Sequence, residues 1–336
     1  FLLMLLPLFC VGTGSGLILS HFGQQAGRVY AFDIVGAGIG SVCVIGVLFL
    51  IPPHSLLVVL TALALFAAAI AAIEMRIRRK LWIVLLGMAF LVLVTVPPDW
   101  FRVHPSLYKD LSQTLNITGT QVIEERSSAL GQIKVVESPR ILFRFAPGMS
   151  LYAMEEPPDQ LGIFVDGDGP SVLTRFDGRL EPLSYLDQLT SALPYHVLQR
   201  PHSGPHVLVL GAGAGSDVLQ ALYHGAIMID AVELDRNIIN LVKERFHDFA
   251  GDIYTLPQVD VHVAEARGFI NATRGRYDLV QIALLDSFGV ASAGVYGLSE
   301  SYLYTVEAYQ TYLSRLTPGG VLAITRWLTL APGDAL

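Results

Sequence analysis

The sequence predicts a multi-pass α-helical membrane segment, then a small β domain, then an α/β domain with a parallel sheet. Three observations carry this prediction: the amino-terminal part is apolar and almost free of charge, short alternating segments follow it, and strand and helix patterns then alternate. A chain of 336 residues has room for about two domains of ~100 to 200 residues each. We expect membrane helices over residues 1–97, a linker and the β domain over 98–180, and the α/β domain over 181–336.

The composition separates a lipid-compatible part from a water-compatible part. Apolar residues make up 52% of the chain and charged residues 15%, against about 25% charged residues in an ordinary soluble domain. Beyond Pro97 the chain has 17 basic and 27 acidic residues, a net charge of −10. This charge repels a phosphate backbone and attracts cations, so we expect a small cationic substrate and no nucleic acid. Cys10 and Cys43 both lie in apolar runs, which excludes a disulfide scaffold and a thiolate site, and we expect no metal.

Four apolar runs approach the length of ~20 residues that a helix needs to cross the hydrocarbon core. They span residues 1–20, 30–51, 56–73 and 81–96. Buried core helices are the alternative for any one run, but four runs in succession favour a segment embedded in a lipid bilayer. In the second run, Gly36 and Gly40 predict a contact face for a neighbouring helix.

Alternating segments after residue 115 predict the small β domain, and helical spacing first returns at residues 183–198. The β-domain strands are expected at residues 121–126, 132–137, 141–145, 161–165 and 171–175. Strands and helices then alternate, which indicates a parallel sheet covered by helices on both faces. Its strands are expected at 206–210, 227–232, 259–263, 277–282 and 321–325, and its helices at 216–223, 236–246 and 301–316.

A glycine-rich loop follows the first strand of this series and precedes a helix. Gly211, Gly213 and Gly215 let the backbone approach a ligand closely, and the helix that follows supplies free amides. A dinucleotide loop needs a glycine where this chain has Ser216, so the pattern favours an adenosylmethionine-type ligand over a dinucleotide.

Two acids follow the next two strands. Glu233 ends the second strand, 22 residues after Gly211, where a carboxylate accepts hydrogen bonds from ribose hydroxyls. Glu265 and Ala266 end the third strand, within reach of an adenine amino group, although Glu265 is also placed to cap a helix. Since the carboxyl ends of parallel strands share one edge of a sheet, we expect a single pocket there.

With these motifs the chain resembles the spermidine and spermine synthase family of polyamine aminopropyltransferases, in the subgroup with a membrane-embedded amino-terminal region. The resemblance covers residues 130–327 and rests on GQIKVVE, IFVDG, VLVLGAGAG, VELD, AEAR, YDLVQ and LYTVEAYQTYL followed by LTPGGVL. It implies a Rossmann-like methyltransferase-type fold, here incomplete at the carboxyl terminus. It also implies that decarboxylated S-adenosylmethionine gives its aminopropyl group to a polyamine such as putrescine.

The resemblance also implies the site residues. Those expected to bind the nucleoside co-substrate are Gly211, Gly213, Gly215, Glu233, Asp235, Glu265 and Ala266. Tyr185 and Asp187 resemble residues that line the family's amine pocket. Two family acids are replaced by Ala214 and Ala283, and Asp286 is the candidate substitute for the catalytic acid at Ala283.

Other functions stay open. The missing acid at position 214 also suits a methyltransferase that uses intact S-adenosylmethionine, and Ala283 with the membrane segment suits a non-catalytic nucleoside- or polyamine-binding sensor or transporter module. The basic residues 76–80 predict a cytoplasmic loop, and one further crossing puts the α/β domain outside the cell. Because the co-substrate is made in the cytosol, we expect instead a protein of the inner membrane whose α/β domain lies in the cytoplasm. The sequence is also compatible with a homo-oligomer.

Overall fold

The structure is a computed structural model that describes most of the chain. The described residues are 2–51, 53–74, 80–97, 106–128, 130–140, 148–150, 152–153, 155–198, 204–283 and 302–326. The expected strand at 141–145 and the candidate acid Asp286 lie outside them. The chain divides into two compact units, Phe1–Val103 with Ser127–Ala129, and His104–Arg126 with Leu130–Leu336.

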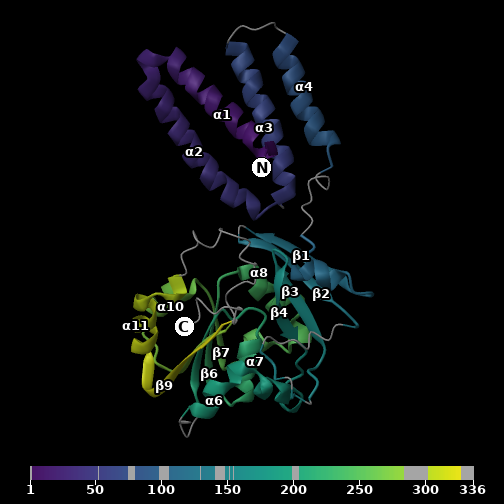
Figure 1. Cartoon of the computed structure of the whole chain (residues 1–336), viewed down its shortest axis with the longest axis vertical. Helices are drawn as coiled ribbons and strands as arrows, with labels where there is room; N and C mark the ends of the chain where they lie inside the picture. The colour runs from purple at the N-terminus through teal and green to yellow at the C-terminus, as the bar shows by residue number, and fades with distance from the viewer. Residues whose placement is uncertain are drawn as a thin grey trace. The chain divides into compact units, whose positions relative to one another are not determined.

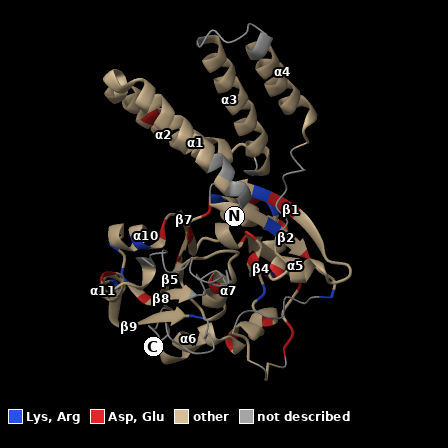
Figure 2. Ribbon diagram, turned by 45° about the horizontal axis from the view of Figure 1, so that its top comes forward, with Lys and Arg blue, Asp and Glu red and all other residues tan. Residues whose placement is uncertain are grey.

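The first unit is helical, as the apolar runs predict. Its elements are α1 (Leu2–His21), the short turn η1 (Gly23–Gln25), α2 (Ala26–Leu48), α3 (Pro53–Glu74) and α4 (Lys80–Thr95). Figure 2 shows their ribbons largely free of charged residues. Gly23–Leu48 and His54–Ile73 are long and apolar enough to cross a membrane, whereas Trp82–Thr95 is shorter. The assignment of these helices as membrane spans rests on their length and composition alone, so a multi-pass membrane segment stays a prediction.

The helices of this unit expose much apolar surface. Phe32 and Val42 of α2 are 73% and 72% exposed, which is typical of a helix that contacts lipid or another protein. Helix α3 packs on α4, and the buried side chains among the described residues of these two helices are Val58, Ala62, Ala69, Ala72 and Ala89. Apart from the nearby backbone of the same helix, nothing in the described part of the chain lies within 4 Å of a Cβ added at Gly36 or Gly40, so the expected contact face stays a prediction.

The second unit begins with helix α5 (Asp110–Leu115) and a four-stranded sheet in the order β1-β2-β3-β4. The strands are β1 (Gln121–Ser128), β2 (Gly131–Glu137), β3 (Gln160–Val165) and β4 (Asp168–Thr174). β3 and β4 are antiparallel, with Val165 opposite Asp168. Asp166 and Gly167 between them have φ values of 52° and 79°, which is the backbone of a type I′ hairpin turn. The described strands expected for the small β domain thus form one sheet, while their separation as a domain of their own stays a prediction, because they share a compact unit with the parallel sheet.

The same unit contains the expected parallel sheet. Its strands are β5 (His206–Leu210), β6 (Met228–Glu233), β7 (Val259–Val263), β8 (Tyr277–Ala283) and β9 (Leu316–Thr325). They are hydrogen-bonded in the order β7-β6-β5-β8-β9, and each pair is parallel. The fold is Rossmann-like, and its strand order reverses between β5 and β8, the kind of point at which such sheets bind ligands.

Helices cover both faces of the parallel sheet (Figure 1). Val207 and Val209 of β5 share one apolar core with α7 (Ser216–Tyr223), and Leu208 and Leu210 share another with α11 (Val306–Ser314). The remaining helical elements are α8 (Arg236–Asn240), η5 (Leu241–Arg245), α9 (His247–Ala250), η6 (Ile253–Thr255), α10 (Ala266–Ala272) and η8 (Tyr302–Tyr304). For helix α10 the sequence indicates only a possible cap at Glu265 and no range.

One sequence expectation is wrong. Residues 183–198 do not form one helix but three short elements, η3 (Glu181–Gln188), η4 (Thr190–Ala192) and α6 (Leu193–Val197). Pro194 explains the break, because it lacks the N–H that would bond to residue 190 and its ring crowds the preceding turn. The apolar spacing still indicates which side chains face the core, since Leu183, Tyr185 and Leu186 are all buried.

We predict that Gly251→Ala destabilises the fold by about 2 kcal/mol or more. Gly251 has a φ of 60°, and a Cβ there would lie 2.3 Å from the carbonyl oxygen of Phe176, so left-handed strain and a backbone clash add together. Denaturant unfolding of the full chain in detergent measures the loss. Gly225→Ala is the control, because its φ is 79° but nothing lies within 4 Å. Equal losses of unfolding free energy in the two variants would show that the short distance from residue 251 to the carbonyl oxygen of Phe176 does not matter.

Candidate functional site

The glycine-rich loop joins β5 to α7 at the point where the strand order reverses. Gly211, Gly213 and Gly215 have φ values of 85°, 52° and 96°, in the left-handed region that favours glycine. At Gly213 a Cβ would also lie 2.6 Å from the hydroxyl oxygen of Ser171. This glycine is therefore required both for its backbone angle and for space.

Glu233 fastens the glycine-rich loop to the end of β6. Its Oε2 accepts a hydrogen bond from the N–H of Gly213 at 2.9 Å, and its Oε1 accepts one from the N–H of Asp235 at 2.9 Å. Burial raises the pKa of Glu233, although the two backbone donors act in the opposite direction. Since each carboxylate oxygen has two lone pairs, the group retains acceptor capacity for two hydroxyls.

The acids beyond Glu233 start helices. The carboxylate of Asp235 accepts from the N–H of Asn237 at 2.8 Å and caps α8. Glu265 caps α10, accepting from the N–H groups of Arg267 at 2.9 Å and Gly268 at 2.6 Å. The helix cap allowed by the sequence is thus present at Glu265.

Glu265 and Ala266 nevertheless lie beside Glu233. β6 and β7 are adjacent, and the N–H of Ala264 donates to the carbonyl oxygen of Glu233 at 3.1 Å. Ala266 is the first residue of α10. The loop, Glu233 and the end of β7 therefore share one edge of the sheet, while contact of Glu265 or Ala266 with an adenine stays a prediction.

Tyr185 and Asp187 make other contacts. Tyr185 is buried in η3, with its hydroxyl 2.9 Å from Oγ1 of Thr174 in β4, and burial raises its pKa. Oδ1 of Asp187 lies 2.8 Å from Nε2 of His196. None of these contacts joins the glycine-rich loop or Glu233. Their place in an amine pocket stays a prediction, as does the role of Asp286 outside the described residues.

Sequence reasoning missed Asp217, the acid in the first turn of α7. Its Oδ1 accepts a hydrogen bond from Nε2 of Gln281 at 2.8 Å, and Oε1 of Gln281 accepts one from the hydroxyl of Tyr195 at 2.8 Å. Protein encloses the carboxyl group although the residue keeps some exposed surface, and this burial raises the pKa to about 7 against the opposing Gln281 bond. Its position after the loop was visible in the sequence, but its enclosure depends on β8.

Two further residues hold the loop from outside the parallel sheet. Oγ of Ser171, in β4, accepts from the N–H of Ala214 at 2.9 Å. The buried Tyr254 donates its hydroxyl to the carbonyl oxygen of Gly213 at 2.7 Å. The β domain and the segment before β7 thus fix the loop conformation, and no local sequence signal marks either residue.

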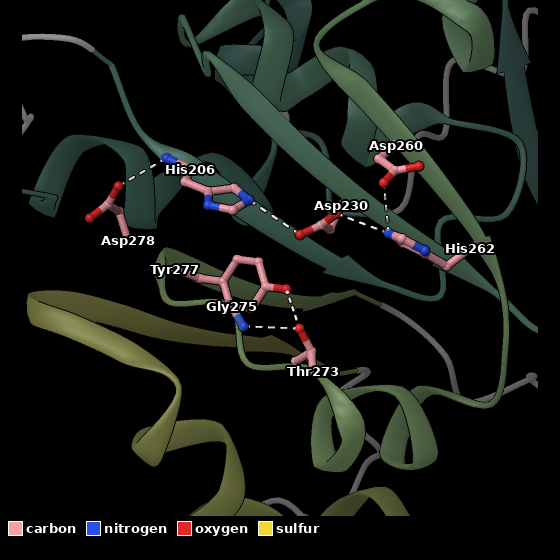
Figure 3. A network of polar contacts seen from close by, with 8 residues as sticks. All are labelled: His206, Asp230, Asp260, His262, Thr273, Gly275, Tyr277 and Asp278. Carbon is pink, nitrogen blue, oxygen red and sulfur yellow. Dashed lines mark hydrogen bonds and ion pairs between the residues drawn. The ribbon is translucent and has the colours of Figure 1, made fainter.

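A second polar network lies on the sheet itself (Figure 3). The carboxylate of Asp230 in β6 sits between Nε2 of His206 at 3.2 Å and Nε2 of His262 at 2.9 Å. Burial alone would raise the pKa of Asp230, but the hydrogen bonds from these histidines and Tyr277 outweigh it and lower the pKa to about 2. Asp230 lies three residues before Glu233 on β6. Because folding lowers the pKa of its carboxyl, the network stabilises the folded state above about pH 4.

The family is decided by comparison with known proteins. Residues 190–326 match the sequence model of the Spermine/spermidine synthase domain. The match covers less than half of the chain, and this part is similar to the spermine/spermidine synthase family. The family recognition made from the motifs is confirmed, and the glycine-rich loop, Glu233 and Glu265 all lie within this synthase domain.

Several proteins that are similar to this chain are named as aminopropyltransferases or spermidine synthases. Polyamine aminopropyltransferase 2 of Pseudomonas aeruginosa is 27% identical over 153 residues, which are 44% of this chain and 41% of that protein. The polyamine aminopropyltransferase of Nitrosomonas europaea is 24% identical over 207 residues, 61% of this chain and 52% of that protein. Spermidine synthase from Thermotoga maritima, a crystal structure, is 18% identical with a TM-score of 0.41, covering 60% of this chain and 56% of that one. The chain spans about half the length of the curated relatives it matches, or less.

Proposed function

We propose that the protein transfers an aminopropyl group from decarboxylated S-adenosylmethionine to a small amine such as putrescine. One observation carries the proposal: Glu233 is held by the glycine-rich loop at the edge of a synthase-family sheet, with acceptor capacity left for two ribose hydroxyls. The relatives named polyamine aminopropyltransferases support the reaction type. The acidic balance beyond Pro97 would attract the cationic amine.

The transfer is a displacement at carbon. The free amine nitrogen attacks the methylene carbon next to the sulfonium, a C–N bond forms, the C–S bond breaks, and methylthioadenosine leaves. The amine must lose a proton before it attacks. The family's acid is replaced by Ala283 in this chain, so in this proposal the nearby Asp286 accepts the proton instead. In the same proposal, Tyr185 lines the pocket that binds the amine.

We also propose that α1 to α4 hold the protein in the inner membrane, with the synthase domain in the cytoplasm. Two helices long enough to cross and the strongly exposed apolar side chains of α2 support the anchor. The cytoplasmic side is favoured by the cytosolic source of a nucleoside co-substrate. Protease accessibility in sealed, inverted vesicles tests the side, because a cytoplasmic domain would be cleaved there.

Incubation of the full-length protein with putrescine and decarboxylated S-adenosylmethionine is expected to produce spermidine and methylthioadenosine in equal amounts. Nucleoside binding without either product would remove the proposal and favour a sensor or transporter module. Intact S-adenosylmethionine is the second arm, since Ala214 and Ala283 leave no acid at the family's two positions. Formation of S-adenosylhomocysteine in that arm would favour a methyltransferase instead.

A further inference from the structure

We propose that Asp187, His196 and His224 form a zinc site, separate from the nucleoside edge of the sheet. The three side chains come from η3, from α6 and from the carboxyl end of α7. The glycine-rich loop precedes the other end of α7. The site is thus separate from the glycine-rich loop, and in this proposal Oδ1 of Asp187 holds the metal ion rather than an amine.

The donor atoms converge on one point. Oδ1 of Asp187 lies 2.8 Å from Nε2 of His196 and 3.4 Å from Nε2 of His224, and all three donor atoms lie within 4.8 Å of one another. In a tetrahedral zinc site, bonds of ~2.0 to 2.2 Å put neighbouring donor atoms about 3.3 to 3.6 Å apart. The distance from Asp187 to His224 falls in this range and the distance from Asp187 to His196 is shorter, so a small rotation of the exposed His196 side chain would make room for zinc.

The donor set suits zinc chemically. Two imidazoles and one carboxylate are a common ligand set for Zn²⁺, and three protein ligands leave the fourth position for water. The exposed fractions of the side chains are 33% for Asp187, 51% for His196 and 4% for His224. The metal would therefore be reached from solvent on the His196 side, while His224 forms the inner wall.

The ring of His224 is already held in position. It stacks on Tyr195 with ring centroids 4.4 Å apart and planes 8° apart, and it meets the rings of His196 and Tyr223 edge to face. A ligand with a fixed ring loses less conformational freedom on binding metal. Since the ligands lie on three separate elements, a bound ion would also tie η3, α6 and α7 together.

The polar network around Asp230 is a weaker candidate. Its histidines lie against opposite oxygens, His206 against Oδ2 and His262 against Oδ1, so their nitrogens do not share one acceptor atom. The donors that lie within 4.8 Å of one another there are Asp230, Asp260 and His262, so only one imidazole takes part, and the Asp260 side chain is 73% exposed. The Asp187 site instead brings two imidazoles to one carboxylate oxygen.

Zinc binding to the full-length, metal-stripped protein in detergent tests the proposal without any activity measurement. Elemental analysis after dialysis is expected to find one zinc per chain, and competition with a chromophoric chelator gives the affinity. His196→Ala removes a half-exposed ligand and is expected to weaken binding at least ~100-fold, since loss of even an outer partner of a ligand typically costs 10- to 100-fold. Zinc should also raise the Tm of the wild type and leave that of His196→Ala unchanged.

His262→Ala is the matched control, because it removes the other candidate group while leaving the Asp187 site intact. Zinc affinity close to that of the wild type in His262→Ala, together with loss in His196→Ala, supports the assignment. Unchanged affinity in His196→Ala, loss in His262→Ala, or no zinc retained by the wild type would each overturn it. Asp187→Asn provides a second ligand variant and is expected to weaken zinc binding in the same way.

Discussion

Replacing Glu233 with alanine is expected to weaken binding of methylthioadenosine thirtyfold or more. A carboxylate that accepts two hydroxyl hydrogen bonds contributes about 2 to 4 kcal/mol, because charge-assisted bonds are stronger than neutral ones. The structure adds a second cause: the variant also frees the N–H groups of Gly213 and Asp235, which now bond to Glu233. Calorimetric titration of the full-length protein with methylthioadenosine measures the change.

Two controls separate ligand binding from folding. Glu244→Gln neutralises an exposed acid elsewhere in the synthase domain and should bind like the wild type. Glu233→Gln keeps the shape of the side chain, but its amide NH₂ must face one of the two backbone donors, so it should also bind weakly. Equal affinity of Glu233→Ala and wild type, with a normal Tm in both, would remove Glu233 from the pocket.

The frame of the site could be predicted because its signals are local. A buried strand, three glycines and a helix start follow one another between His206 and Tyr223, and the structure keeps that order. Glu233 ends the next strand, and the parallel order brings it beside the loop. Chain position alone was enough to place these elements on one edge of the sheet.

The parts that were missed depend on contacts between distant segments. Ser171 reaches the loop only because β4 packs against α7, and Asp217 is enclosed only because Gln281 of β8 lies beside it. His196 and His224 meet because α6 and the end of α7 approach each other. No spacing in the sequence encodes such contacts. The prediction of a single helix at residues 183–198 is wrong for a local reason: Pro194 interrupts it, and the spacing of apolar residues carries no information about proline.

Asp217→Asn is expected to stabilise the protein above neutral pH. Burial raises the pKa of Asp217 from 3.8 to about 7, so the folded state holds this proton more tightly than the unfolded chain does. A carboxyl with a raised folded pKa favours folding at low pH, and that contribution is lost as the pH rises from about 4 through 7. At pH 8 the wild type keeps a buried charge that asparagine lacks, while the amide oxygen still accepts from Gln281. At about 1.4 kcal/mol per pKa unit, the variant should gain roughly 2 to 4 kcal/mol there.

The measurement is the free energy of unfolding of the full chain in detergent at several pH values from 4 to 8. The difference between Asp217→Asn and wild type should grow with pH and level off above about 7, following the proton that only the wild type releases. Asp230→Asn is the matched control with the opposite sign, because the pKa of Asp230 is lowered to about 2. Its carboxylate stabilises the fold above pH 4, so asparagine there should destabilise the protein at neutral pH. A constant difference between Asp217→Asn and wild type across this range would show that Asp217 titrates normally in the folded state.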